Sequence, residues 1–330
     1  MIELRQLRYF LAIVEQQSLT RAAAVLRVAQ PALSGHVRRM EAHLGTALLL
    51  RTPKGVQPTE AGMALARHAR IMLDQMALAE EEIRGQRDDP AGLVRLGLPG
   101  TIGQILALPL IRAVRRRHPR IQLRVAEAMS GFVRDWLGAG RIDIAVLYED
   151  AAERGIRTER LLEEELVLLG PPARAGAEAM PGSDMALPFR AVLRMDLILP
   201  GEGHGLRALL EAQAAALGQP LETLIDVDSY GNIKALVAEG LGWSILPRNA
   251  VAAEAAQGAL RAWPIRDPQL RRHVHLAHAA QRPMTNAVAA VLGLARETLR
   301  DLVRTGAWTG AELAGDADAA RGMGADLGAR

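Results

Sequence analysis

The chain has 330 residues, a formal net charge of +3 and no cysteine, and 49% of its residues are hydrophobic. This length can enclose more than one hydrophobic core, and the composition excludes a chain that is disordered throughout. The lack of cysteine excludes disulfides and thiolate catalysis. No apolar run approaches the roughly 18 residues of a membrane span, and the first residues have a polar helix pattern instead of a signal peptide. We therefore expect a cytoplasmic protein without membrane contact.

The segment from Ser18 to residue 44 has the pattern of two short helices joined at a tight corner. Ser18 can cap the first helix, over Arg21–Leu26, and Pro31 suits the first turn of the second. Spacings of four, three and four place one apolar stripe on the second helix: Leu33, Val37, Met40 and Leu44. The opposite face is polar and basic: Gln30, Pro31, Ser34, Gly35, Arg38 and Arg39. This pattern is typical of a helix-turn-helix that enters the DNA major groove, with a plain helical hairpin as the alternative.

A basic turn follows the two helices. Short strands are predicted at Leu48–Leu50 and around Val56, on either side of residues 51–55, Arg-Thr-Pro-Lys-Gly. Such a wing can contact phosphates or enter a minor groove. Residues 1–60 contain eight lysines and arginines against four acidic residues, and the excess clusters on the second helix and the wing. Clustered positive charge indicates a nucleic-acid partner.

An ordered set of motifs runs through the same region: Ala22-Ala23, Gln30-Pro31-Ala32-Leu33-Ser34, Glu41, Leu44-Gly45, Arg51-Thr52 and Thr59-Glu60-Ala61-Gly62. Through these motifs the region resembles the winged helix-turn-helix domain of LysR-type transcriptional regulators. The resemblance implies that double-stranded DNA is contacted by eight residues: Thr20, Arg21, Gln30, Pro31, Ser34, Arg38, Arg51 and Lys54. Two positions depart from the family pattern. Gly35 stands where a long polar side chain is usual, and Leu49 replaces a common phenylalanine.

A long helix is predicted from Ala61 to about residue 86. Its apolar residues step by four and three, as in the heptad seam of a coiled coil: Leu65, Ala69, Met72, Met76, Ala79 and Ile83. A hinge sequence follows at 88–92. We therefore expect a linker helix, over 61–88, that pairs two subunits, with a helix lying on its own domain as the alternative. In the resembling family such pairing places two heads on one interrupted inverted repeat, which implies a homodimer or homotetramer.

The part from 93 to 304 alternates strands and helices. Strands are predicted at 93–98, 121–126, 142–147, 166–169, 197–199, 243–246 and 274–276, and helices at 105–117 and 132–137. The alternation predicts a parallel sheet covered on both faces and divided between two subdomains. Ligands of open α/β sheets bind beyond the carboxyl ends of the strands. Thr101 and Ser130 therefore point to a cleft, with residues 201–205 as its opposite wall.

Further motifs stand in this half: Pro99-Gly100-Thr101, Ala107-Leu108-Pro109-Leu110, residues 127–131, Asp143-Ile144-Ala145-Val146 and residues 241–247. They resemble the LysR substrate-binding domain, itself akin to periplasmic binding proteins, and look closest to the nitrogen assimilation control branch. The resemblance implies a small, often anionic effector between two lobes, although that branch can work without one. The predicted effector-binding residues are Thr101, Ser130, His204 and Arg207, with Arg207 as a carboxylate ligand. The alternative is that these residues cap helices and bind nothing.

Other chemistries have little support in the sequence. His273, His275 and His278 could suggest a metal, but no carboxylate is near in sequence, and a half-buried strand edge explains them better. Residues 201–205 lack the spacing of a phosphate-binding loop, and we find no catalytic constellation. We expect no metal, no cofactor and no enzymatic activity.

Together these patterns predict a sequence-specific DNA-binding transcriptional regulator, controlled by a small-molecule effector or by promoter context, in nitrogen or small organic acid metabolism. The expected α/β chain joins an all-α winged helix-turn-helix (1–60) and a linker helix (61–88) to a two-lobed, periplasmic-binding-protein-like domain (93–304) and a disordered tail (305–330). RNA polymerase is a further candidate partner. The alternatives are a solute-binding protein that uses the two-lobed cleft and, with less support, an enzyme.

Overall fold

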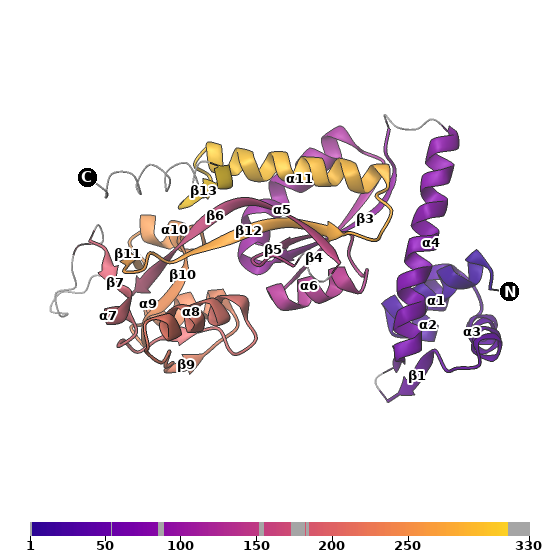
Figure 1. Cartoon of the computed structure of the whole chain (residues 1–330), viewed down its shortest axis with the longest axis horizontal. Coiled ribbons are helices and arrows are strands. Elements are labelled where there is room, and N and C mark those ends of the chain that lie inside the picture. The colour runs from indigo at the N-terminus through magenta and orange to yellow at the C-terminus, as the bar shows by residue number, and fades with distance from the viewer. Residues whose placement is uncertain are drawn as a thin grey trace.

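The computed structural model describes residues 2–53, 55–84, 89–151, 155–172, 182 and 185–315. A small helical head and one long helix stand beside a two-lobed α/β domain (Figure 1). The head comprises α1 (Leu4–Gln16), α2 (Leu19–Leu26), α3 (Gln30–Leu44) and the hairpin of β1 (Leu49–Thr52) and β2 (Gly55–Pro58). The long helix is α4 (Glu60–Arg84).

The two lobes follow one another along the chain. Lobe I contains β3 (Gly92–Pro99), α5 (Gly100–Arg117), β4 (Ile121–Ala128), α6 (Ser130–Gly138), β5 (Ile144–Leu147), α11 (Asn286–Arg304) and β13 (Ala311–Leu313). Lobe II contains β7 (Leu187–Pro188), α7 (Phe189–Val192), β8 (Ile198–Leu199), α8 (Gly205–Ala216), β9 (Ile225–Asp226), α9 (Tyr230–Ala238), β10 (Ser244–Pro247), α10 (Arg248–Ala256) and β11 (Arg261–Arg266). Two long strands, β6 (Ile156–Gly170) and β12 (Arg271–Ala279), run between the lobes (Figure 1).

The head folds around two small apolar clusters. In α3, Leu33 and Val37 are buried in one cluster and Met40 in the other, which confirms most of the predicted stripe. Leu44 is the exception, because 43% of it is exposed. It is the last residue of α3, and Gly45 then turns the chain away with a left-handed φ of 68°.

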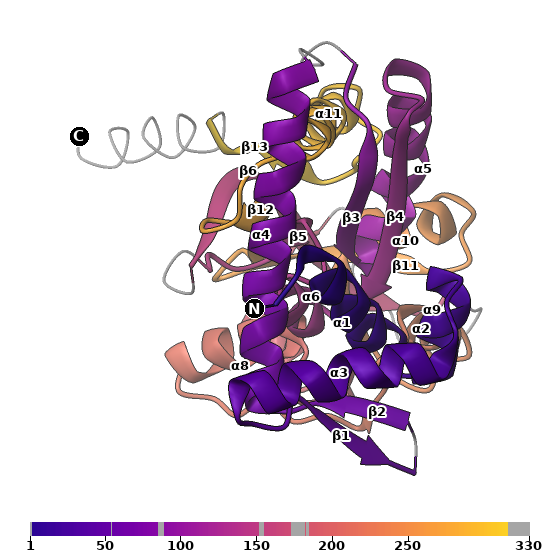
Figure 2. The same cartoon turned by 90° about the vertical axis from the view of Figure 1, so that its right-hand side faces the viewer.

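The two halves of α4 have different surroundings. Near the head, Ala66 and Ala69 are buried in the core that α1 forms. Farther along, Met72, Met76 and Ile83 are 43%, 41% and 85% exposed. Figure 2 shows α4 rising from the hairpin past α1 toward α11. The first half of α4 therefore packs on its own head, whereas the second half leaves these three apolar side chains exposed and contacts lobe I through Asp74 and Glu81.

Strand β6 belongs to both lobes. Its residues Leu161 and Leu162 lie in the core of lobe I, and its residues 166–169 lie in the core of lobe II. Strand β12 pairs with it antiparallel, with a register shift between Val274 and His275. The chain thus crosses to lobe II along β6 and returns along β12, and the two strands form the connection between the lobes.

Because of this crossing, the prediction of a parallel sheet is confirmed only for part of the sheet. Strands β3, β4 and β5 are parallel neighbours, as predicted. However, β12 is antiparallel to both β5 and β6, and β10 and β11 are antiparallel to β6. The antiparallel pairing of β12 follows from the return of the chain along this strand, which local alternation in the sequence does not reveal.

The prediction that the chain is disordered from residue 305 onward is wrong for residues 305–315. After α11 the chain buries Trp308, which is 1% exposed, and then forms β13, which pairs with β6 through residues 311–313. The Trp308 indole Nε1 donates to Glu164 Oε2 at 3.1 Å. A buried indole with a satisfied N–H explains why this segment is ordered. Residues 316–330 lie outside the described part of the chain. Within the described part, no helix is both long and apolar enough to cross a bilayer.

We expect Trp308→Ala to lower the free energy of unfolding by about 3–5 kcal/mol, because it opens a cavity in lobe I and removes the indole donor to Glu164 Oε2. Trp308→Phe keeps most of the ring volume and should cost about 1–3 kcal/mol. Urea unfolding followed by far-ultraviolet circular dichroism measures both. Equal stability of the wild type and Trp308→Ala would contradict the docking of this segment.

Candidate nucleic-acid interface and interlobe cleft

The first turn of α3 and its two arginines, Arg38 and Arg39, form an exposed surface. Gln30, Pro31 and Arg38 are all exposed, as predicted. Pro31 lies in the first turn of α3, where the missing N–H removes no intrahelical hydrogen bond. Arg39 is also exposed, and its Nη2 lies 2.9 Å from Nδ1 of His36. This surface combines free polar groups with positive charge on one helix.

Ser34 differs from the prediction, because it is only 7% exposed. The Ser34 hydroxyl accepts a hydrogen bond from Nη2 of Arg51, at 3.5 Å. Arg51 lies on β1 and is exposed. The hairpin therefore covers Ser34, and Ser34 fixes the direction of a wing arginine relative to α3.

Thr20 and Arg21 are exposed at the start of α2. The predicted cap is present, since Ser18 Oγ accepts from the Arg21 backbone N–H at 3.3 Å. The Arg21 side chain donates from Nη2 to the Gln16 carbonyl at 2.7 Å, so its guanidinium is turned back toward α1. Lys54, the remaining predicted DNA contact, lies outside the described residues.

The wing is fixed to the helices through its backbone. Glu41 Oε1 accepts the backbone N–H groups of Leu48 and Leu49 at 2.9 and 3.3 Å. Gly55 has a φ of 130°, and a Cβ atom there would collide with the Gln17 carbonyl oxygen at the end of α1. These contacts hold the hairpin and α3 as one rigid surface.

The motif at residues 59–62 closes the head onto α4. Thr59 Oγ1 donates to the Ala47 carbonyl at 2.7 Å and accepts the Gly62 N–H at 3.0 Å. A Cβ atom at Gly62 would collide with the Leu48 carbonyl oxygen. The backbone segments around Leu48 and Gly62 approach each other closely, and this approach requires the residue types of the motif.

Gly35 is not required in this way. A Cβ atom at Gly35 would meet only Nη1 of Arg39, at 3.6 Å, which is an ordinary van der Waals distance. Gly35 also lies within α3 and not at a turn. Packing against the rest of the head therefore does not explain this departure from the family pattern.

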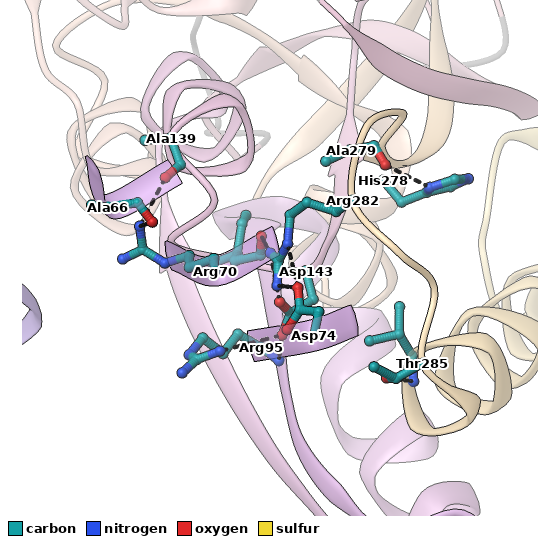
Figure 3. A network of polar contacts seen from close by, with 12 residues as sticks. Ala66, Arg70, Asp74, Arg95, Ala139, Asp143, His278, Ala279, Arg282 and Thr285 are labelled. Atoms are coloured by element: carbon teal, nitrogen blue, oxygen red, sulfur yellow. Dashed lines mark hydrogen bonds and ion pairs between the residues drawn. The ribbon is translucent and has the colours of Figure 1, made fainter. Parts of the chain in front are cut away.

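An ion-pair network joins α4 to lobe I (Figure 3). Arg282 follows β12 and donates to Asp74 of α4 from Nε and Nη2, at 2.9 and 2.6 Å. Its Nη1 lies 2.8 Å from Asp143 Oδ1, and Asp143 Oδ2 accepts the Arg95 backbone N–H at 2.7 Å. Burial raises the pKa of Asp74, and the charge of Arg282 opposes this shift. We call Asp74, Asp143 and Arg282 the latch.

The predicted cleft residue Thr101 belongs to a buried polar cluster. It lies at the start of α5, and its Oγ1 is 2.5 Å from the Tyr148 hydroxyl and accepts from Arg272 Nη2 at 3.2 Å. Arg272 is 2% exposed, stacks over the Tyr148 ring and donates from Nε to Glu164 at 2.5 Å. Burial alone would lower the pKa of Arg272, but the Glu164 carboxylate holds it above its ordinary value. Within the described residues Arg272 Nη1 has no hydrogen-bond partner.

The residues predicted for the opposite wall of the cleft lie on lobe II. His204 caps α8 through Nδ1, which accepts the Leu206 N–H at 3.1 Å, and its Nε2 lies 3.3 Å from the Tyr230 hydroxyl. Burial lowers the pKa of His204 to about 4, so the ring is neutral at pH 7 and carries its proton on Nε2. Ser130 of lobe I is 8% exposed, and a Cβ atom at Gly205 would lie 2.8 Å from its Oγ. The two lobes therefore meet at these residues.

Arg207 does not join this cluster. Its Nε donates to Glu211 at 2.7 Å, and its Nη1 donates to Asp226 and Thr223 at 3.2 and 3.3 Å. The structure thus directs the guanidinium to acceptors of its own lobe. Of the four predicted residues, Thr101, Ser130 and His204 lie at the junction of the lobes and Arg207 does not.

Arg272, Glu164 and Tyr148 are not among the residues predicted from the sequence. A signal was present, because residues 163–165 are all glutamate and residues 271–273 are Arg-Arg-His. In β6 and β12 these triplets are direct antiparallel neighbours. Two oppositely charged triplets inside strands that are otherwise apolar could have indicated this pairing.

The prediction that the histidines of β12 lie at a half-buried strand edge is also wrong. The strand lies inside the sheet, between β5 and β6, and not at an edge. His275 is buried, and His273 Nδ1 is 3.6 Å from Glu163. The described residues contain no group of three or more histidines, cysteines or carboxylates that could hold a metal ion.

Comparison with known proteins agrees with this geometry. Residues 4–63 match the model of the bacterial regulatory helix-turn-helix proteins of the lysR family, and residues 87–300 match that of the LysR substrate binding domain. The nitrogen assimilation regulatory protein nac of Klebsiella aerogenes is 34% identical over 88% of this chain and 94% of its own length. That of Escherichia coli K12 is 32% identical over 87% and 93%.

Among solved structures, a full-length OxyR variant from Pseudomonas aeruginosa superposes with a TM-score of 0.73, at 26% identity, over 91% of this chain and 95% of that one. The matching families and relatives are transcriptional regulators, which favours a regulator over the solute-binding and enzyme alternatives. Both halves of the chain are matched, each by its own family model. The chain therefore belongs to the LysR family of DNA-binding transcriptional regulators, with a winged helix-turn-helix head and a two-lobed effector-binding domain.

Proposed function

We propose that α3 enters a major groove while the wing contacts the flanking backbone. The observation that carries this proposal is the rigid basic surface that α3 and the hairpin form together. Arg38 and Arg51 are exposed on it, and Ser34 and Glu41 hold its two parts in register. Exposed arginines on a fixed helix and hairpin suit phosphate and base-edge contacts.

The second half of α4 pairs two copies of this chain into a homodimer, which can assemble further into a tetramer. The exposed Met72, Met76 and Ile83 support this, because they continue the heptad seam and remain open to solvent on α4. Two heads related by a twofold axis fit a promoter with an interrupted inverted repeat. RNA polymerase is a further partner that a promoter-bound regulator would meet.

The interlobe cleft binds a small anionic effector. Arg272 Nη1 supports this, because a buried guanidinium nitrogen without a hydrogen-bond partner is a ready donor for a carboxylate. Thr101, Ser130 and His204 surround the same junction of the lobes. The names of the relatives from Klebsiella aerogenes and Escherichia coli favour genes of nitrogen assimilation as targets, with small organic acid metabolism as the other candidate.

Effector or promoter context acts on the heads through the latch. Asp74 lies on the helix that carries the head, while Asp143 and Arg282 lie on lobe I. When lobe II moves relative to lobe I, β6 and β12 transmit the displacement to lobe I. Arg282 then transmits it from lobe I to α4. The resulting change in head spacing would alter how the promoter is bent.

We expect Arg38→Ala to weaken promoter binding by about 1–3 kcal/mol, because it removes one contact from the recognition helix. A gel-shift titration at several salt concentrations measures the affinity and its salt dependence. Arg116→Ala, an exposed arginine on α5, is the matched control and should bind as the wild type does. If Arg38→Ala keeps both the affinity and the salt dependence of the wild type, α3 is not the recognition helix.

A panel of small mono- and dicarboxylates, scored by the rise in unfolding temperature, identifies a cleft ligand. We expect Thr101→Val to lose most of the response to a carboxylate that stabilises the wild type, because the valine no longer orients Arg272 or Tyr148. Arg207→Gln should respond normally, since its guanidinium is engaged within lobe II. A normal response in Thr101→Val would place the ligand elsewhere.

Gly35→Ala should stabilise the head by about 0.5–1 kcal/mol, because alanine lowers the backbone entropy of the unfolded chain and meets no close neighbour in α3. Thermal unfolding of the full chain measures this effect. A loss of stability would mean that packing requires Gly35, and the space on α3 would not be available for a longer side chain.

A further inference from the structure

A cavity of about 290 Å³ lies where the head, α4 and lobe I meet. Its walls come from the end of α1, from α4, from β3 and β4, from α6 and from the segment before β5. Four arginines line it against a single carboxylate, that of Glu15: Arg70, Arg95, Arg124 and Arg141. This excess of positive charge marks the cavity as a candidate anion site that is separate from the interlobe cleft.

Arg70 is the most constrained of the four arginines. It is 5% exposed, and its Nη1 donates to the carbonyls of Ala66 and Ala139 at 3.4 and 3.2 Å. Within the described residues its Nε and Nη2 have no hydrogen-bond partner. Its Nη2 forms a long ion pair with Glu15 Oε1, at 3.7 Å. Burial lowers the pKa of Arg70 to about 10, with Glu15 opposing and neighbouring arginines reinforcing the shift. Two buried guanidinium nitrogens are thus left without acceptors.

The sheet places two further arginines side by side. Arg95 on β3 and Arg124 on β4 are register partners in the parallel pair. Like charges at paired positions destabilise a sheet unless a counter-charge lies between them. Glu15 is 3.5 Å from Arg95 Nη2, but the same oxygen also serves Arg70. Asp143, which is 3.7 Å from Arg95 Nη1, is already paired with Arg282 in the latch.

The cavity also has an apolar side. Trp136 and Ile142 line it on lobe I, and Val14 lines it on α1. Its volume is at the lower end of the range for small-molecule sites. The lining therefore suits a small metabolite whose carbon skeleton lies on Trp136 and whose oxyanion groups meet the arginines.

We propose that this cavity binds a small multivalent oxyanion, a phosphate ester or a polycarboxylate, and that the bound anion ties the head to lobe I. The oxyanion would accept hydrogen bonds from Arg70 of α4 and from Arg95, Arg124 and Arg141 of lobe I. It would neutralise charges from the linker helix and from the sensor at one point. The bound anion would be a second regulatory ligand, in addition to the cleft ligand, and its site would lie next to the head.

Isothermal titration calorimetry of the full chain, with inorganic phosphate and with citrate at constant ionic strength set by chloride, tests the binding. We expect saturable binding of at least one of them. Binding of phosphate alone identifies a phosphate ester as the natural ligand class, and binding of citrate alone identifies a polycarboxylate. No saturable binding of either anion overturns the proposal.

Two exposed arginines make the decisive variant. Arg124→Gln combined with Arg141→Gln should weaken the affinity by about tenfold or more, through the loss of two charge-assisted hydrogen bonds. Both side chains are exposed, so the fold is retained, and Arg116→Gln is the control at an exposed site outside the cavity. Unchanged affinity in the double variant overturns the site. Loss of binding in Thr101→Val, with the double variant intact, would assign the anion to the cleft instead.

Hydrogen–deuterium exchange tests the tie between head and lobe. With saturating anion, amides near residues 14–17 at the end of α1 should exchange more slowly in the wild type and not in the double variant. Binding without protection of this segment would overturn the bridging role.

Discussion

The buried ion pair between Arg272 and Glu164 holds the sensor together, because it lies where β6 and β12 cross from one lobe to the other. Both side chains are almost fully buried, at 2% exposure each. Removing one member of such a pair leaves an unpaired buried charge and costs about 3–5 kcal/mol. Other elements converge on it, since Thr101 of α5 contacts Arg272 and Trp308, after α11, contacts Glu164. The same pair thus fixes the crossing strands, the start of α5 and the segment before β13.

The head could be predicted from the sequence almost completely, because its determinants are local. The cap at Ser18, Pro31 in the first turn of α3 and the stripe from Leu33 to Met40 each act within a few residues. The structure differs from the prediction in the exposure of Leu44 and Ser34. Their exposure depends on where α3 ends and on how the hairpin packs across it, and neither is encoded in helical periodicity.

The sensor core was harder to predict, because its polar cluster joins residues that are far apart in sequence. Arg272 and Glu164 are separated by 108 positions. The three glutamates at 163–165 interrupt the apolar run of β6, so only the stretch from Leu166 to Leu169 had the pattern of a strand. The arginines of β12 and its neighbours satisfy those carboxylates in the fold, and the sequence indicates this pairing only through the two charged stretches at 163–165 and 271–273, which are far apart in the chain.

The junction between head and sensor is built from charge, whereas each lobe is built from apolar packing. Asp74 and Arg282 are paired there, and beside them Arg70 has two nitrogens without a hydrogen-bond partner among the described residues. An ion-pair junction is sensitive to counter-ions and its partners can be exchanged, while an apolar junction of the same size would fix one arrangement. A regulator must change the placement of its heads without unfolding either domain. A polar junction between two apolar cores meets that requirement. The apolar cores stabilise the fold of each domain, whereas the charged groups at the junction determine how the domains are oriented.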